Sequence, residues 1–215
     1  MTYSVSGIVF DLDGTLVHTA PQYRHIVVSK TLKDLGVRSW NHEDVDRFWF
    51  CADRRTIIQE CFGVERNAFW AAYRMHDSIE LRLKMTYVYG DVPEALRMFR
   101  DGGVKLGVVT GAPLHIAGIE LEKVDIRLFD AVIFNNPKCG FAYKPNSAGL
   151  ERCLEIMGVL RNSAMYVGNA DEDVYTARSA GVDDVLVDRG EHVFPGLQPS
   201  HTVSDLLVLE RILRK

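Results

Sequence analysis

Two aspartates one residue apart, Asp11 and Asp13, follow an apolar run at residues 7–10. Such a run is typical of a short buried strand, whereas carboxylates belong at the surface or at a functional site. Residues i and i+2 of an extended chain point the same way, roughly 6–7 Å apart, so both carboxylates can face one pocket. One of them can then attack or hold a metal while the other moves a proton. The alternative without a functional role is a strand end followed by an ordinary Asp-Gly turn at Gly14.

Later apolar runs in the chain also end in polar residues. These runs are 106–109 before Thr110-Gly111, 131–134 before Asn135-Asn136, 164–167 before an acidic loop at 168–173, and 185–187 before Asp188. Helical patterns separate most of them, which is typical of a parallel sheet covered by helices on both faces. Ligands of such sheets bind beyond the carboxyl ends of the strands, so these polar residues are expected along one edge. The sequence predicts an α/β fold with a Rossmann-like parallel sheet.

A long helical stretch separates the first predicted strand from the others. The expected helices cover residues 23–35, 43–50, 55–62 and 67–85, and no strand is predicted among them. A further helix, 94–101, begins just after a Gly-Asp-Val-Pro turn and belongs to the core. The predicted organisation is therefore an α/β core made of residues 1–15 and 88–215, with an all-α insertion at residues 16–87.

The order of the polar motifs carries a resemblance to a known family. The chain shows D-x-D-G-T at residues 11–15, a strand ending in Thr110, Lys144-Pro145 ahead of a helix, and the acidic loop 168–173 after a later strand. In this order the motifs resemble the haloacid dehalogenase-like hydrolase superfamily, and most closely its phosphoglycolate-phosphatase-like branch. The resemblance covers nearly the whole chain, and it implies that the helical insertion is a cap over the active site.

The resemblance also implies a role for each polar residue. Asp11 falls at the position of the nucleophile, Asp13 at the general acid/base, Thr110 with Gly111 at the phosphate-binding site, and Lys144 at the charge-neutralising lysine that also contacts phosphate. The implied activity is Mg²⁺-dependent hydrolysis of a small phosphomonoester through an aspartyl-phosphate. Lys144 would offset negative charge in the transition state, and amides after Thr110, at a helix N-terminus, would hold phosphate oxygens.

The metal loop departs from the family pattern. The implied Mg²⁺ ligands are Asp11, the backbone carbonyl of Asp13, and the side chain at position 169, with Asp173 as a ligand or as support for one. The family usually carries an aspartate where this chain has Asn169. An amide oxygen still coordinates a hard cation, but it brings no charge; Asp171 and Glu172 nearby could compensate. A second departure is His18, where relatives often carry an acid.

Substrate specificity is expected in the predicted cap. The loop between its second and third helices includes Arg54 and Arg55. Arginine suits a carboxylate or a second phosphate on the leaving group, through a bidentate fork. The alternative is that both are solvated residues in the first turn of a helix. If they bind substrate, phosphoglycolate or a sugar phosphate is favoured.

Composition agrees with a globular enzyme of small metabolites. The 215 residues are 47% hydrophobic, and 25 Lys and Arg against 29 Asp and Glu give a net charge of −4. This balance does not support nucleic-acid or membrane binding, and no run reaches the length of a signal peptide or membrane span. The four cysteines lack metal-ligand spacing, which favours reduced thiols and a cytoplasmic protein. The expected partner is a small phosphorylated metabolite, and the expected state a monomer or homodimer.

Two further functions compete with the phosphatase. A phosphomutase of the same family would use the same aspartyl-phosphate but rephosphorylate its product instead of releasing phosphate. A catalytically weak phosphate-binding regulatory module is motivated by Asn169, although Asp11, Asp13, Thr110 and Lys144 are all retained. Release of inorganic phosphate from a simple monoester separates these alternatives.

Overall fold

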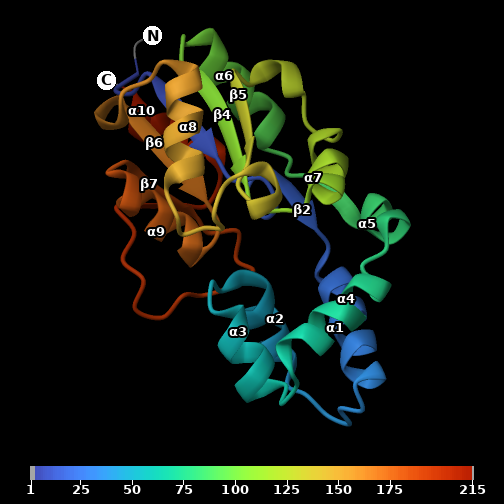
Figure 1. The fold of residues 1–215 in the computed structure, drawn as a ribbon. Helices are drawn as coiled ribbons and strands as arrows, with labels where there is room; N and C mark the ends of the chain where they lie inside the picture. Colours follow the sequence, from blue (N-terminus) through green and yellow to red (C-terminus); the bar gives the residue numbers. More distant parts are fainter. Residues whose placement is uncertain (1–2, 215) are drawn as a thin grey trace. The chain divides into compact units, whose positions relative to one another are not determined.

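The computed structural model of the protein describes residues 3–214. The chain divides into two compact units, one formed by Met1–His18 with Val88–Lys215 and the other by Thr19–Tyr87. The first unit holds a parallel sheet with helices, and the second is built of helices (Figure 1). Within the described residues, no helix has both the length and the apolar character that spanning a membrane would require.

The first unit is built on a six-stranded sheet in the order β5-β4-β1-β6-β7-β8, in which every pairing is parallel. Its strands are β1 (Gly7–Phe10), β4 (Lys105–Thr110), β5 (Ala131–Phe134), β6 (Ala164–Gly168), β7 (Asp183–Val187) and β8 (His201–Val203). From β1 the chain builds β4 and β5 on one side and later β6 to β8 on the other. The strand order thus reverses at β1, and a switch point of this kind is where open parallel sheets bind ligands.

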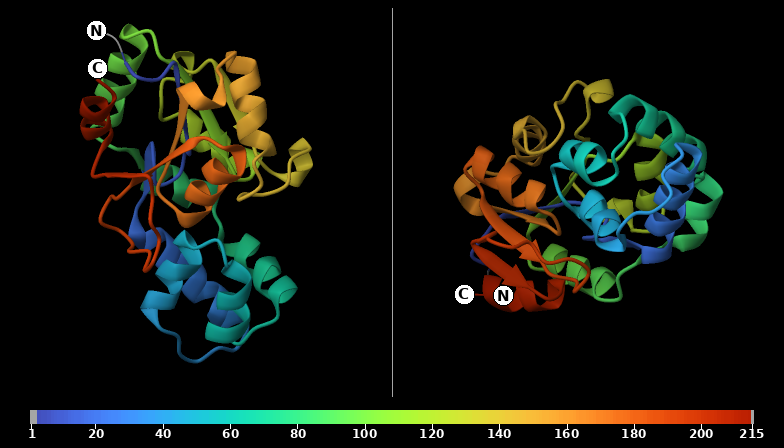
Figure 2. Two further views of the ribbon diagram at one scale, coloured as in Figure 1. Left: turned by 90° about the vertical axis from the view of Figure 1, so that its left-hand side faces the viewer. Right: turned by 90° about the horizontal axis from the view of Figure 1, so that it is seen from below.

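Both faces of the sheet are covered, as the continuous apolar strands require. Ile8 and Phe10 of β1 pack on one face with α6 (Val92–Asp101), α7 (Leu114–Leu121) and α10 (Leu206–Leu213). Val9 packs on the opposite face with α8 (Ala148–Met157) and α9 (Asp171–Ala180). Figure 2 shows the sheet from two further directions. The predicted α/β class, a parallel sheet between helical layers, is confirmed.

The second unit packs its helices around aromatic side chains. It contains α1 (Pro21–Asp34), α2 (His42–Phe50), α3 (Arg54–Thr56), the π-helix η1 (Ile57–Cys61), α4 (Arg66–His76) and α5 (Ile79–Met85). The Phe48 ring lies 5.1 Å from the Phe69 ring, and both side chains are buried. Short 3-10 turns elsewhere in the chain are η2 (Ile126–Leu128), η3 (Pro137–Cys139) and η4 (Arg161–Ser163).

Two sequence predictions about the helical stretch are wrong. The single helix expected at 67–85 is two helices, because Asp77 leaves the helical conformation and Ser78 caps α5 by accepting a hydrogen bond from the Leu81 amide at 3.3 Å. The stretch also contains strands: β2 (Val17–Thr19) and β3 (Thr86–Val88) form a two-stranded sheet at its two ends. Each is only three residues long, too short for a periodic pattern.

Candidate active site

The candidate site lies at the carboxyl ends of the central strands. Phe10, the last residue of β1, pairs with Val108 of β4 and Val167 of β6, so the next residue, Asp11, stands level with the ends of both neighbours. The Asp11 amide continues the ladder by donating to the Val167 carbonyl at 2.9 Å. The β1 backbone is therefore held straight up to Asp11, and this places its carboxylate at the switch point.

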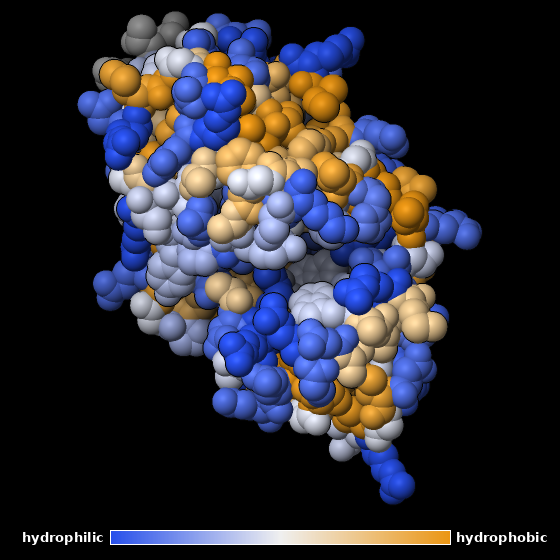
Figure 3. Space-filling model, viewed as in Figure 1, coloured by the Kyte–Doolittle hydropathy of each residue, from blue (hydrophilic) through white to orange (hydrophobic). Residues whose placement is uncertain are grey.

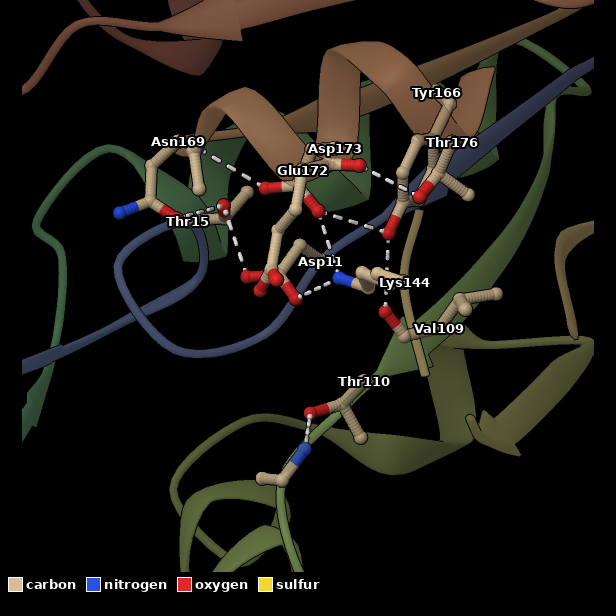
Figure 4. Close-up of polar contacts among 12 residues, drawn as sticks. Asp11, Thr15, Val109, Thr110, Lys144, Tyr166, Asn169, Glu172, Asp173 and Thr176 are labelled. Carbon is tan, nitrogen blue, oxygen red and sulfur yellow. Dashed lines mark hydrogen bonds and ion pairs between the residues drawn. The ribbon is translucent and has the colours of Figure 1, made fainter. Parts of the chain in front are cut away.

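Asp11, Lys144 and Asp173 form a buried ion-pair cluster at this edge (Figure 4). The Lys144 Nζ lies 2.5 Å from Asp11 Oδ1 and 2.7 Å from Asp173 Oδ1. Lys144 comes from the loop before α8, and Asp173 from the first turn of α9. The family resemblance placed Asp11 and Lys144 at one site, with Asp173 as a metal ligand or as support for one, and in the structure Lys144 contacts both acids.

Burial and charge act in opposite directions on these groups. Desolvation raises the pKa of Asp11 to about 7, although the neighbouring Lys144 ammonium lowers it. Burial alone would lower the pKa of Lys144, but the Asp11 and Asp173 carboxylates raise it well above its ordinary value. Lys144 is therefore a permanent positive charge, buried beside two carboxylates.

Tyr166 contacts this ion-pair cluster through its hydroxyl and its ring, and no sequence pattern pointed to it. Its hydroxyl lies 3.2 Å from Asp173 Oδ1 and 3.2 Å from the Val109 carbonyl. The Lys144 Nζ stands 5.5 Å from the centre of its ring. The other Asp173 oxygen, Oδ2, accepts from the Ala170 amide at 3.1 Å. Because three donors already engage its carboxylate, Asp173 is arranged to hold Lys144.

Thr15 connects the Asp11 carboxylate to Asn169. Its buried hydroxyl lies 3.4 Å from Asp11 Oδ2 and 3.4 Å from Asn169 Oδ1. Gly14 makes room for the amide: a Cβ at this position would come within 2.0 Å of Asn169 Nδ2, and its φ of +87° suits glycine. The turn after β1 therefore cradles the Asn169 amide next to the nucleophile candidate.

The residues present here fit a hard divalent cation. Asp11 Oδ2 and Asn169 Oδ1 face the same hydroxyl, and carboxylate, amide and main-chain oxygens are the ligands that Mg²⁺ takes. Across residues 3–214, no three His, Cys, Asp or Glu side chains gather as a ready-made metal site. A cation at this edge would therefore depend on a mixed and weakly charged ligand set.

Thr110 occupies the end of β4, next to the ion-pair cluster (Figure 4). Its side chain is buried, and its hydroxyl oxygen accepts from the Ala112 amide at 3.1 Å. A hydroxyl that accepts from the backbone keeps its own proton for donation, which suits contact with a phosphate oxygen. The expected helix after Thr110 is α7, which begins at Leu114, so the short loop of Gly111, Ala112 and Pro113 separates the threonine from the first helical turn.

A second polar network braces the turn after β1. Arg189 donates to the Thr15 carbonyl at 2.9 Å and to Asp91 at 2.8 Å, with its guanidinium 4.0 Å from the centre of the Tyr89 ring. His18 pairs with Glu191 at 2.8 Å. The loop after β7 therefore holds the turn that carries Asp13, which is half-buried. Sequence reasoning missed Arg189 because nothing near it in the chain marks it.

The two predicted substrate-binding arginines lie in the helical unit and differ in setting. Arg54 is half-buried and donates to the Trp49 carbonyl at 3.3 Å, whereas Arg55 is exposed and contacts Gln59 at 3.4 Å. Asp53 caps this short helix by accepting from the Thr56 amide. Within their own unit, Arg54 is thus tethered to the end of α2, and Arg55 has the surroundings of a surface residue.

Figure 3 shows one face of the molecule coloured by hydropathy. Hydrophilic residues predominate on the part of this face formed by the helical unit, with smaller apolar areas among them. Exposed apolar side chains of this unit include Met75, Ile79 and Leu83. Isolated exposed apolar residues are ordinary on protein surfaces and need no functional explanation.

Comparison with known proteins agrees with this geometry. The family model for haloacid dehalogenase-like hydrolases matches residues 8–187. A phosphoglycolate phosphatase of Pseudomonas putida is 28% identical over 213 residues, covering 94% of this chain and 77% of the relative. One from Aquifex aeolicus is 26% identical over 179 residues, covering 83% of each.

Other relatives act on different phosphate esters. An N-acetylmuramic acid 6-phosphate phosphatase of Pseudomonas aeruginosa is 22% identical over 213 residues, covering 95% of this chain and 90% of the relative. Among solved structures, a haloacid dehalogenase-like family hydrolase of Streptococcus pneumoniae superposes with a TM-score of 0.80 at 19% identity, covering 97% and 98% of the two chains. The chain therefore belongs to the haloacid dehalogenase-like hydrolase family, in its phosphoglycolate-phosphatase-like branch.

Proposed function

We propose that this protein is a Mg²⁺-dependent phosphatase of small phosphomonoesters that works through an aspartyl-phosphate on Asp11. The observation that carries the proposal is the contact of Lys144 with Asp11 at 2.5 Å, at the switch point of the sheet. An exposed carboxylate with a lysine partner would be an ordinary surface pair. A buried one, next to Thr110 and a cation-compatible turn, is equipped for phosphoryl transfer.

The two oxygens of Asp11 have different surroundings, which suggests a division of roles. Oδ2 faces the side of Asn169, and Oδ1 contacts Lys144. Asp11 Oδ2, the Asp13 carbonyl and Asn169 Oδ1 would hold Mg²⁺, which when bound screens charge between the carboxylate and the phosphoryl group. Asp173 holds Lys144 in our proposal, so its direct coordination of the metal, predicted from sequence, is the less favoured role.

The reaction then proceeds in two balanced steps. Asp11 Oδ1 attacks phosphorus in line, the bond to the leaving oxygen breaks, and Asp13 gives that oxygen a proton. Asp13 next takes a proton from water, whose oxygen attacks the aspartyl-phosphate and releases inorganic phosphate. Lys144 and the Thr110 hydroxyl bind the phosphoryl oxygens in both steps, where negative charge develops.

We propose further that the helical unit, Thr19–Tyr87, is the cap that the sequence predicted at residues 16–87, and that Arg54 binds an anionic group on the leaving alcohol. Phosphoglycolate or a sugar phosphate would supply such a group, and the names of the relatives agree with this substrate class. Arg54 is the better placed of the two arginines because its guanidinium is already tethered. The cytoplasmic location drawn from the cysteines stays a prediction.

The deciding experiment measures inorganic phosphate from p-nitrophenyl phosphate and from a panel of phosphorylated metabolites, with Mg²⁺ and with EDTA. We expect Mg²⁺-dependent release by the wild type and loss of at least about a thousandfold in Asp11→Asn. A phosphomutase would instead move phosphate between substrate positions without releasing it. Absence of turnover in the wild type and also in Asn169→Asp would favour the regulatory phosphate-binding module, for which Asn169 is the motivating residue.

A further inference from the structure

The metal loop of this chain carries one negative charge fewer than the family pattern, because Asn169 stands in place of an aspartate. Asp11, Asp13 and Asp173 bring three negative charges to the strand ends, and Lys144 removes one. Asn169 would coordinate through a neutral amide, whereas the family pattern carries a carboxylate there. Since affinity for a hard divalent cation depends on the charge of its ligands, the site as it stands should hold Mg²⁺ weakly.

Glu172 is placed to restore that charge. It stands in the first turn of α9, three residues after Asn169, and its side chain is half-buried. Figure 4 shows this side chain extending from the helix toward the Asp11 carboxylate, on the side that also holds Asn169. Its negative charge is among the influences that raise the pKa of Lys144, whose Nζ contacts Asp11. Glu172 is therefore electrostatically part of the site.

The neighbouring acids are less suited to this role. Asp173 is turned inward, and its carboxylate is engaged by Lys144, Tyr166 and the Ala170 amide. Asp171 precedes Glu172 by one residue, which turns its side chain by about 100° around the helix axis. Glu172 is thus the acid that extends toward Asp11, while its neighbour Asp173 holds Lys144.

We propose that Glu172 supplies the negative charge that Asn169 lacks and so sets the affinity of the site for its divalent cation. This rests on the proposed function, because it assumes that Mg²⁺ binds between Asp11 and Asn169. The negative charge that the family pattern places at position 169 is found three residues later in this chain, at Glu172 in the first turn of α9. Glu172 acts on the cation from the outer shell, as second-shell carboxylates do at other metal sites.

The test is direct titration of the metal-free protein with Mg²⁺ by isothermal calorimetry, without substrate. Glu172→Gln should weaken binding by about ten- to a hundredfold, the usual effect of losing an outer-shell partner. Asp171→Asn is the matched control, because it removes one charge from the same helical turn, and its affinity should stay within a factor of about two. Circular dichroism melts without metal verify that both variants fold.

A double variant makes the compensation explicit. Asn169→Asp should bind Mg²⁺ more tightly than the wild type, and adding Glu172→Gln to it should return the affinity close to the wild-type value. Equal affinities for Glu172→Gln and Asp171→Asn would overturn the inference while leaving the proposed function intact. A wild-type protein that binds no Mg²⁺ would overturn both.

Discussion

At the scale of single residues, the site is defined by a lysine shared between two carboxylates. Lys144 is buried between Asp11 and Asp173, and neither acid has another cation among its described contacts. Moving charges out of water is costly, and the cost is repaid only while the partners remain together. The arrangement that we propose for attack on phosphate therefore also makes the folded protein depend on Lys144 for its stability.

Replacing Lys144 by alanine should both inactivate and destabilise the protein. The variant leaves two buried carboxylates close together without a counter-charge, which costs about 3–5 kcal/mol in the free energy of unfolding. The loss of stability should be smaller at lower pH, because the carboxylates of Asp11 and Asp173 then bind protons and lose their charge. Urea denaturation at pH 5 and pH 8 measures this, and an equal loss at both values would contradict it. Exposed Lys84, which pairs with exposed Glu80 at 2.7 Å, provides the control substitution.

Asp11 should link Mg²⁺ binding to pH. Burial raises its pKa to about 7, and the metal requires the ionised form. Below pH 7 a bound proton must leave before the cation enters, so the affinity should fall by about tenfold per pH unit there and level off above. Calorimetry in two buffers of different ionisation enthalpy, at pH 6 and pH 8, should detect proton release only at the lower pH. Equal proton release at pH 6 and pH 8 would contradict the assignment of this pH dependence to Asp11.

At the scale of elements, the hydroxyl of Tyr166 in β6 contacts both β4 and α9. Tyr166 lies in β6, contacts the carbonyl of Val109 in β4, and contacts Asp173 in α9. Val109 immediately precedes Thr110, so the strand end that we propose to bind phosphate and the acid that holds Lys144 both contact the Tyr166 hydroxyl. The relative position of these elements is thereby fixed from within the core.

Tyr166→Phe tests this connection without opening a cavity. It removes a buried hydroxyl and leaves its partners short of a donor, which should cost about 1–2 kcal/mol of stability. Because Asp173 then holds Lys144 less firmly, we expect kcat to fall with KM nearly unchanged. Buried Tyr23, in the helical unit, is the control: Tyr23→Phe should lower stability and spare kcat. A parallel loss of kcat in both variants would mean that Tyr166 acts through stability alone.

The elements differ in how well the sequence predicted them. Strands β1, β4, β5 and β6 are continuous apolar runs with polar ends, so their existence followed from the pattern. The meeting of Asp11 with Lys144 was expected only from the family resemblance, because Lys144 lies in a loop and ends no strand. By contrast, β8 and α10 were missed, because three residues at His201–Val203 give no periodicity. The break at Asp77-Ser78 was missed because a local cap competes there with an otherwise helical pattern.

The site was predicted unevenly for a similar reason. Residues in motifs with a fixed chain order could be placed from sequence, as Thr110 and Asp173 were. Tyr166 reads as one more apolar residue of a strand, and Arg189 as one charge in a loop. Their roles depend on contacts across 57 residues, from Tyr166 to Val109, and 174 residues, from Arg189 to Thr15. Only the folded chain shows such contacts.

At the scale of the whole molecule, the residues of the proposed chemistry and of the proposed substrate choice lie in different units. The ion-pair cluster belongs entirely to the unit with the sheet, whereas Arg54 and Arg55 belong to the helical unit. In our proposal, the phosphatase chemistry can thus remain constant while the helical unit selects among leaving groups. This division agrees with relatives named for different phosphate esters.

Arginine variants in the helical unit should therefore separate substrates. Arg54→Ala should raise KM for phosphoglycolate by about tenfold or more, the equivalent of one charge-assisted hydrogen bond, and leave KM for p-nitrophenyl phosphate nearly unchanged. Arg55→Ala, one residue away and exposed, should change neither by more than about twofold. Steady-state kinetics on both substrates checks this, and an equal effect of the two variants on phosphoglycolate would remove Arg54 from the specificity assignment.

The ion pair between Asp11 and Lys144 spans 133 positions of the chain, and this has a consequence for synthesis. The ribosome delivers the carboxylate of residue 11 well before its lysine, the acid that contacts that lysine, and the arginine that holds the turn. Burying an ionised carboxylate without its counter-ion is costly, so we expect the central strand to complete its packing only once these later neighbours have been made. The buried ion pair can form only after residue 144 has joined the chain.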